Sequence, residues 1–218
     1  MCNLYALTKG QAAIREFTGA MQDTTGNLPP LPGIFPDQLA PVAHLARDGA
    51  RELGMMRWGM PPPPGLGNRP ITNVRNLGSA YWRTWLKPEW RCLVPATSFC
   101  EYTDSQPKVP HWFALAEDRP LFAFAGIWRP WTGRRGTKAD PQEGEHRLFA
   151  FLTCAANEVV RPIHAKAMPV LLTTPEACAA WLQGSLEQAA ALQRPLPAEA
   201  LRIVATGARK DAGGTGVA

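Results

Sequence analysis

The chain has 218 residues, of which 45% are hydrophobic, so it can bury a sizeable core without disulfide support. Its five cysteines include no C-x-x-C pair, which argues against a disulfide framework and against a structural zinc site. The formal net charge of +5 permits a polyanionic partner but does not require one.

The beginning of the chain has no features of an export signal. Met1 to Gln11 lacks a basic start followed by an apolar run. No apolar stretch in the chain approaches membrane-spanning length. We therefore expect a reduced, cytoplasmic protein that makes no membrane contact.

Short strands and loops alternate in the first part of the chain. Asn3 to Leu7 is a predicted strand, and Thr8 to Gln11 fits a capping box at the start of a helix. Ala40–Ala46 and Glu52–Trp58 predict paired strands, because Asp48-Gly49 between them is a hairpin-type turn.

A proline-rich loop follows this hairpin. Gly59 to Pro70 contains the run Pro61 to Pro64, which excludes a helix or a central strand. We expect this stiff segment to form one wall of a groove.

The rest of the chain is dominated by strand patterns. Trp131 to Glu145 is polar and Gly-rich, which favours a mobile loop, and Thr174-Pro175-Glu176 begins a helix that Gly184 ends. The remaining predicted strands are Arg91–Tyr102, Pro110–Ala116, Leu121–Trp128 and Arg147–Cys154. Because strands outnumber helices, the prediction is one β-rich α+β domain over residues 1–209, of mainly antiparallel strands. Residues 210–218 are small and polar, and we expect them to be a disordered tail.

Cys2 carries the most distinctive chemistry in the sequence. Its small side chain permits removal of Met1, which would leave a free α-amine beside a thiol. Such an amine has a pKa of about 7.7–8.0 and is partly neutral near pH 7, so it can attack an aldehyde to form a Schiff base. The thiol can then close a five-membered thiazolidine ring, which no internal cysteine can do because its nitrogen is part of an amide.

Four further residues are candidates for the same chemistry. Asn73 offers an amide that could orient an amine or an oxyanion, and Arg75 offers a fork for phosphate. Glu101 closes an apolar strand, where loss of solvent would raise its pKa. His164 stands in an apolar segment that suits a proton-transfer group. Each residue alone is more often structural or surface-exposed.

Together, these residues resemble the SOS-response-associated peptidase (SRAP) family over residues 2–183. The similarity rests on an ordered set of motifs: Met1-Cys2-Asn3-Leu4-Tyr5, Arg57-Trp58-Gly59-Met60-Pro61, Asn73-Val74-Arg75, Arg91-Cys92-Leu93-Val94-Pro95 followed by Glu101, and Ile163-His164 with Met168-Pro169-Val170-Leu171.

The resemblance implies a barrel-like core and a covalent crosslink between Cys2 and abasic sites in single-stranded DNA, after loss of Met1. It implies catalytic roles for Cys2, Asn73, Glu101 and His164, and no cofactor or metal. We further expect a monomer that associates with the nucleoid when bound to DNA, and possible lyase activity. The residues that the resemblance places against DNA are Arg75, Lys166, Tyr102, Trp58 and Leu66.

The sequence departs from the family pattern at three places. The segment from His164 to Pro169 is one residue longer than usual and lacks the acid. The loop from Pro61 to Leu66 has no tryptophan to wedge between bases, although Pro and Leu side chains can do so. No Asn-containing segment like the family's is recognisable in Ala205 to Asp211.

Other functions remain open on the sequence alone. An N-terminal-nucleophile amidohydrolase or glutamine amidotransferase also exposes a cysteine, although Cys2 is followed here by Asn3 and such chains commonly have Gly. A non-covalent single-stranded DNA-binding protein would need only charge and stacking. A dedicated peptidase acting on foreign proteins is the weakest of these alternatives.

Overall fold

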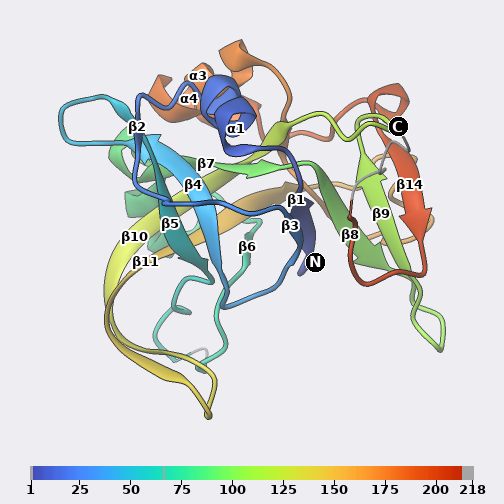
Figure 1. Cartoon of the computed structure of the whole chain (residues 1–218), viewed down its shortest axis with the longest axis horizontal. Helices are drawn as coiled ribbons and strands as arrows, with labels where there is room; N and C mark the ends of the chain where they lie inside the picture. The colour runs from blue at the N-terminus through green and yellow to red at the C-terminus, as the bar shows by residue number, and fades with distance from the viewer. Residues whose placement is uncertain (1, 66, 213–218) are drawn as a thin grey trace.

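The computed structural model describes residues 2–65 and 67–212, which form a strand-rich α+β fold (Figure 1). Five strands close into a barrel, because β5 and β11 pair in parallel at Arg57 and Leu148 while the other four pairings in the ring are antiparallel. The barrel strands are β4 (Leu39–Leu45), β5 (Arg51–Trp58), β7 (Arg91–Ala96), β10 (Phe122–Gly136) and β11 (Pro141–Cys154). Four short strands join them: β2 (Gln22–Asp23), β6 (Asn73–Val74), β12 (Met168–Pro169) and β13 (Leu171–Leu172).

A second sheet stands beside the barrel. Its strand order is β14 (Arg202–Thr206), β9 (Pro110–Ala114), β8 (Ser98–Tyr102), β1 (Tyr5–Leu7) and β3 (Leu31–Ile34). All of its neighbouring strands are antiparallel. The fold class predicted from the sequence is therefore confirmed.

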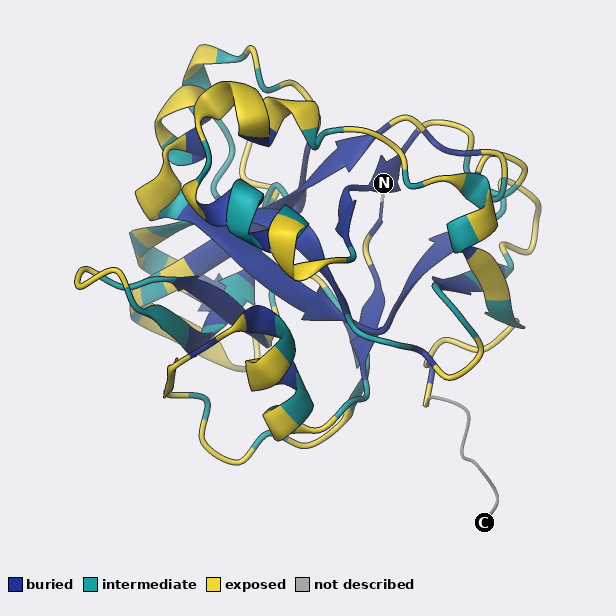
Figure 2. Ribbon diagram, turned by 90° about the horizontal axis from the view of Figure 1, so that it is seen from above, coloured by how far each residue is buried: buried dark blue, intermediate teal, exposed yellow. Residues whose placement is uncertain are grey.

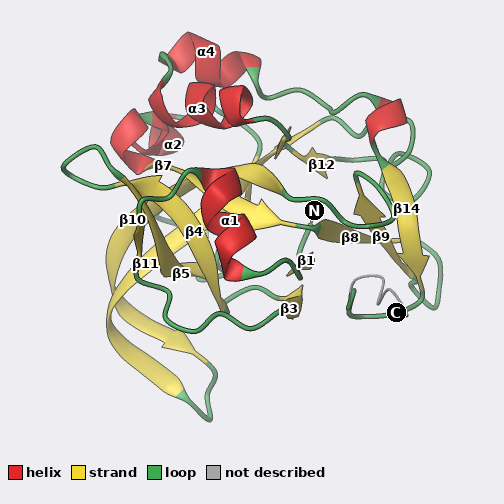
Figure 3. Cartoon of the chain, turned by 45° about the horizontal axis from the view of Figure 1, so that its top comes forward, coloured by secondary structure: helices red, strands yellow, loops and turns green. Residues whose placement is uncertain are grey.

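Helices cover one side of the barrel (Figure 3). The α-helices are α1 (Gln11–Thr18), α2 (Ala80–Arg83), α3 (Pro175–Gln183) and α4 (Leu186–Ala191), and the short 3-10 helices are η1 (Thr84–Leu86), η2 (Pro88–Trp90) and η3 (Ala198–Ala200). Thr174 caps α3 as predicted, since its side chain accepts a hydrogen bond from the Ala177 N–H. No helix in the described part of the chain is long and apolar enough to cross a membrane.

The core joins the barrel to the second sheet. Tyr5, from β1, packs edge-on against Trp58 and Phe124, with ring centroids 5.1 and 5.4 Å away. The rings of Phe124 and Phe151 stack at 4.4 Å. Figure 2 shows that the buried residues lie mainly in strands across the middle of the molecule, while the exposed residues are concentrated in helices and loops. The start of the chain is thus anchored by the barrel core.

The predicted strand Arg91–Tyr102 is divided into β7 and β8, which belong to different sheets. Thr97 lies between them, fully buried, and its N–H donates to Ala6 O at 2.8 Å. The apolar sequence continues through this point because both sheets bury their strands, so the sequence pattern does not show the break.

Two other local predictions are wrong. The segment Trp131–Glu145 is not a loop but the outer part of a long β10–β11 hairpin, which curls away from the barrel in Figure 1. Helix α1 has Gly10 at its N-cap instead of Thr8, with no side-chain cap. The Gln11 amide donates instead to Asp23 Oδ2 at 2.7 Å, because the following loop folds back onto the helix.

The predicted tail does not begin at residue 210. Asp211 is buried, and it accepts hydrogen bonds from Ser98 Oγ at 2.6 Å and from Arg119. Its N–H donates to Pro32 O at 2.8 Å. This contact network holds the segment that follows β14 against the second sheet. The expectation for residues 213–218 lies outside the described residues.

Candidate active site

Cys2 lies at the junction of the two sheets, just before β1. Its side chain is fully buried, and its thiol donates to Leu4 O at 3.4 Å and to Cys100 O at 3.8 Å. Burial raises the pKa of the thiol well above its usual value, and the nearby Glu101 carboxylate raises it further. The thiol therefore stays protonated near neutral pH.

Asn73 connects Cys2 to the barrel. Strand β6 pairs with β11 at Phe151, which places Asn73 at the edge of the barrel sheet. The Asn73 amide nitrogen donates to Cys2 O and to Thr72 Oγ1, both at 2.8 Å. Among the described residues, its amide oxygen is buried without a hydrogen-bond partner. That oxygen is available to accept from an amine or a hydroxyl group.

Glu101 approaches the same junction from β8, which pairs with β1. Its side chain is only 3% exposed. Burial raises the pKa of this carboxyl to about 7, although the positive amino terminus of the chain partly opposes the shift. A carboxyl group with this pKa can both donate and accept a proton near neutral pH.

His164 is in the turn that follows β11. The backbone N–H of His164 donates to Val160 O at 2.8 Å, and the residue is half-buried. Burial lowers the pKa of the imidazole, and the positive charges of the amino terminus and of Lys166 lower it further, against the opposing effect of Asp104. Its imidazole is therefore mainly neutral near pH 7.

Thr72 and Asn3 also support the site, and the sequence reading assigned them no role. Thr72 Oγ1 donates to Asn3 Oδ1 at 2.9 Å and accepts from the Asn73 amide. Only their positions in the sequence could have indicated this role, because Asn3 follows Cys2 and Thr72 precedes Asn73.

Three of the predicted DNA-contacting residues have accessible side chains. Arg75 and Lys166 are exposed, and Tyr102 is half-buried. One Arg75 guanidinium nitrogen donates to Cys154 O, which fixes the side chain at the end of β11. Burial raises the pKa of the Tyr102 hydroxyl, and Arg209, which hydrogen-bonds it, opposes the shift. Leu66 lies outside the described residues.

Trp58 does not have the surface position that a DNA contact requires. Its ring is fully buried and stacks on Phe151 at 5.1 Å, and its indole N–H donates to Thr72 O at 3.1 Å. The prediction of a direct DNA contact is therefore wrong for Trp58. Because its N–H holds the residue before Asn73, Trp58 instead supports the site from within the core.

The described residues contain no group of three or more His, Cys, Asp or Glu residues arranged to hold a metal ion. The functional groups that meet at the junction are the Cys2 thiol, the Glu101 carboxyl and the Asn73 amide. Such groups suit the covalent capture of a carbonyl compound.

Comparison with known proteins supports the family resemblance. The family model for SOS response associated peptidase (SRAP) matches residues 1–209. "Abasic site processing protein YoqW" of Bacillus subtilis (strain 168) is 31% identical over 141 residues, which are 61% of this chain and 58% of the relative. "Abasic site processing protein YobE" of the same strain is 30% identical over 140 residues, covering 61% of this chain and 60% of the relative. The match thus spans less than two thirds of either relative.

Solved structures share the fold. A protein from Bordetella bronchiseptica superposes with a TM-score of 0.71 at 22% identity, covering 94% of this chain and 98% of that one. A phage-related protein of the same species gives 0.68 at 24% identity, covering 94% and 92%. A protein from Bacteroides thetaiotaomicron gives 0.67 at 18%, covering 94% and 90%. With its family model matched over residues 1–209 and its fold shared with these structures, the chain belongs to the SRAP family.

Proposed function

We propose that this protein, once Met1 is removed, forms a covalent crosslink with abasic sites in single-stranded DNA. The observation that carries the proposal is the arrangement of Cys2, whose carbonyl the Asn73 amide holds at 2.8 Å, beside the buried carboxyl of Glu101. The relatives named as abasic site processing proteins support the same substrate.

The amine is the first nucleophile in this scheme, because the buried thiol is protonated. The neutral Cys2 amine attacks the C1′ aldehyde of the ring-opened sugar and forms a carbinolamine. Protonated Glu101 donates to the departing hydroxyl, water leaves, and the Glu101 carboxylate takes the nitrogen-bound proton from the resulting iminium to give the imine. The Cys2 thiol then adds to the imine carbon while its proton passes to the imine nitrogen through Glu101. One water molecule is released, and a thiazolidine ring is closed.

Asn73 and His164 have supporting roles. The free amide oxygen of Asn73 accepts from the Cys2 amine and aims its lone pair at the aldehyde. Neutral His164 exchanges a proton with the sugar hydroxyl as the furanose ring opens. The imine also acidifies the adjacent C2′–H, so strand cleavage by β-elimination is a possible side reaction of the same intermediate.

The strand is held by exposed groups around the junction. Arg75 and Lys166 supply positive charge for phosphates, and the half-buried Tyr102 offers a ring for a neighbouring base. A covalent bond gives long residence, so these contacts need only modest affinity.

The test is the intact mass of the protein after mixing with a single-stranded oligonucleotide that carries one abasic site. We expect a denaturation-resistant adduct on a chain that lacks Met1. Cys2→Ala should form no stable adduct. Cys2→Ser keeps the amine but has a weaker nucleophile than the thiol, so its adduct should require borohydride trapping of the imine.

Two results would contradict the proposal. A full-strength adduct on Cys2→Ala would exclude the thiazolidine, because the Cys2 thiol would then not be needed for a stable bond. A chain without Met1 that forms no adduct would exclude the aldehyde chemistry, and hydrolysis of glutamine would then be measured to test the amidotransferase alternative.

A further inference from the structure

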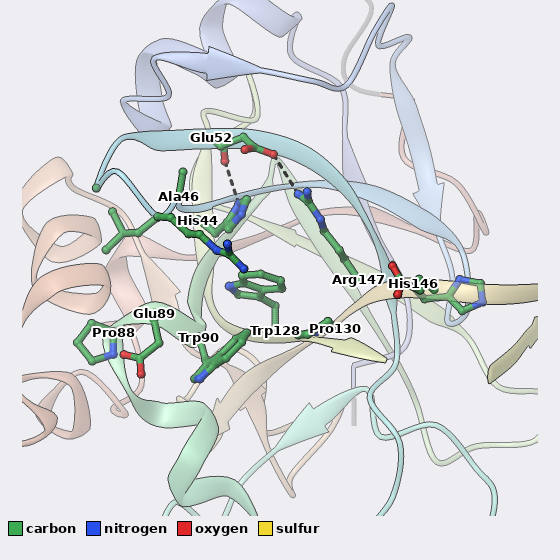
Figure 4. A pocket seen from close by; sticks show the side chains of 14 residues that line it. His44, Ala46, Glu52, Pro88, Glu89, Trp90, Trp128, Pro130, His146 and Arg147 are labelled. Carbon is green, nitrogen blue, oxygen red and sulfur yellow. Dashed lines mark hydrogen bonds and ion pairs between the residues drawn. The ribbon is translucent and has the colours of Figure 1, made fainter. Parts of the chain in front are cut away.

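A hollow of about 1140 Å³ is lined by residues of β4, β5, β10 and β11 and by the 3-10 helix η2 (Figure 4). Trp128 lines this hollow, whereas Phe124, four residues earlier on β10, contacts Tyr5 near Cys2. Four residues of a strand span about 13 Å, so the hollow and the Cys2 site are at different heights along β10. We call this hollow the mouth pocket and define it by His44, Glu52, Glu89, Trp90, Trp128 and Arg147.

Aromatic rings form the inner wall of the mouth pocket. The Trp128 ring meets His44 at 4.7 Å and Trp90 at 5.2 Å, both edge-to-face (Figure 4). Trp90 is half-buried at the end of η2 and in turn meets Trp85 at 5.3 Å. The pocket therefore offers aromatic surface to a planar group.

Trp128 also has an unused hydrogen-bond donor. Within the described residues, its indole N–H is buried and has no acceptor. A buried donor without an acceptor destabilises the folded protein, so it is rarely retained without a reason. Three other buried indoles each donate to a backbone carbonyl: Trp58 to Thr72 at 3.1 Å, Trp112 to Ala208 at 2.8 Å and Trp181 to Cys92 at 2.9 Å. The contrast indicates that Trp128 is placed to donate to a ligand.

The charges of the mouth pocket are nearly balanced. Arg147 and Glu52 form an ion pair at 3.0 Å, and burial lowers the pKa of His44, which keeps its ring neutral. Arg47 and two carboxylates, Glu89 and Glu145, remain at the exposed rim. This distribution has no strong attraction for phosphate, so the pocket favours an uncharged ligand.

We propose that the mouth pocket binds a nucleobase, either of a free nucleoside or of a nucleic-acid strand. A nucleobase combines in one uncharged planar group a face for Trp90 and a carbonyl or ring nitrogen that accepts from the Trp128 N–H. A lysine or arginine side chain could contact the rings but would bring no acceptor for that N–H. This site is separate from Cys2 and does not depend on the crosslinking reaction.

Binding includes a movement of one ring. The Trp128 N–H is buried in the free protein, so binding through this donor requires the neighbouring Trp90 ring, 5.2 Å away, to turn and stack on the base. Stacking of the base on the Trp90 ring compensates for the contact between Trp90 and Trp128 that is lost.

The test follows indole N–H signals in the ¹H–¹⁵N spectrum of the ¹⁵N-labelled full chain. Trp128→Phe removes one signal and so assigns it. Titration with thymidine or adenosine should shift the Trp128 signal saturably, while that of Trp181, which already has an acceptor, stays in place. Trp90→Ala should weaken binding about tenfold, as expected for one lost stacking contact. Trp131→Phe removes an indole outside the pocket and should leave the affinity unchanged.

Titrations with different ligands distinguish a base of a strand from a free nucleoside. A shift that requires a short undamaged oligonucleotide assigns the pocket to bases of a strand, whereas a shift with nucleosides alone assigns it to free nucleosides. Either shift should persist in Cys2→Ala, so failure of the crosslinking chemistry leaves it unaffected. The proposal is overturned if neither ligand moves the Trp128 signal, if arginine amide moves it and they do not, or if Trp90→Ala binds as tightly as the original chain.

Discussion

Glu101 is a carboxyl group that the fold holds out of water. Burial raises its pKa to about 7, from the ordinary value of 4.5. The folded state therefore keeps a proton that the unfolded chain releases, and stability falls as the pH rises through this interval. The same burial gives the group a proton to donate near neutral pH, so the site gains reactivity at a cost in stability.

Replacing Glu101 with Gln should stabilise the protein in mildly alkaline solution. The amide keeps the shape and cannot ionise, so the variant avoids a cost of about 3 kcal/mol above pH ~8. Below pH ~4.5 both states of the wild type hold the proton, and the advantage should vanish. Urea denaturation at several pH values measures it. A stability difference that is the same at every pH would mean that Glu101 does not titrate in this range.

The rate of adduct formation should have a bell-shaped dependence on pH. Protonated Glu101 declines above its pKa of about 7, whereas the neutral Cys2 amine increases through a pKa of about 7.7–8.0. In Glu101→Gln the rate should fall by about 10²–10⁴ and should rise with pH to a plateau. Single-turnover gel assays would check this. A bell-shaped profile retained by Glu101→Gln would assign the alkaline limb to another group.

At this scale, the sequence predicted the identity of the site residues but not how deeply each side chain is buried. The motifs named Cys2, Asn73 and Glu101, and the structure brings these three residues together. Trp58 stands in an equally recognisable motif and proved to be buried. An aromatic residue fits a core and a base-stacking surface equally well, so its sequence alone does not separate the two.

At the scale of elements, the hairpin β4–β5 was predictable because its turn and its apolar strands are local features. The β10–β11 hairpin was not, since beyond Pro130 its residues lie mostly outside the core and show no apolar face. A strand pattern is readable only where one face is buried. The break at Thr97 was hidden for the opposite reason, because the strands on both sides are buried.

The anchor of β14 provides a prediction at this scale. Asp211→Ala would leave Arg119 buried without its carboxylate and remove the acceptor of Ser98, at a cost of about 3–5 kcal/mol in unfolding free energy. Glu117→Ala removes the other, exposed partner of Arg119 and should cost at most about 1 kcal/mol. Chemical denaturation compares the two variants. Equal effects would show that the Asp211 contacts do not hold the strand.

For the whole molecule, the decisive contacts join parts distant in sequence. The barrel closes where β5 meets β11, and Cys2 reaches Asn73 across 71 positions. Periodicity describes one segment at a time, so neither contact could be worked out from it. The family resemblance predicted a barrel-like core, which the structure confirms. The mouth pocket belongs to none of the motifs that carried that resemblance.

Charge acts over the whole surface, and it gives a prediction for binding to undamaged single strands. The net charge of +5 should make this binding salt-dependent, because each cation that pairs with a phosphate releases a counterion. Arg75 is exposed next to the site and fixed by Cys154 O, so Arg75→Ala should reduce the slope of log affinity against log salt by roughly one unit. Arg202, exposed on the edge strand β14, is the matched control, and its replacement by Ala should leave the slope unchanged. Fluorescence anisotropy of a labelled oligonucleotide over a salt series measures both slopes. Equal slopes for the two variants would mean that binding follows net charge alone, and Arg75 would then have no specific phosphate contact.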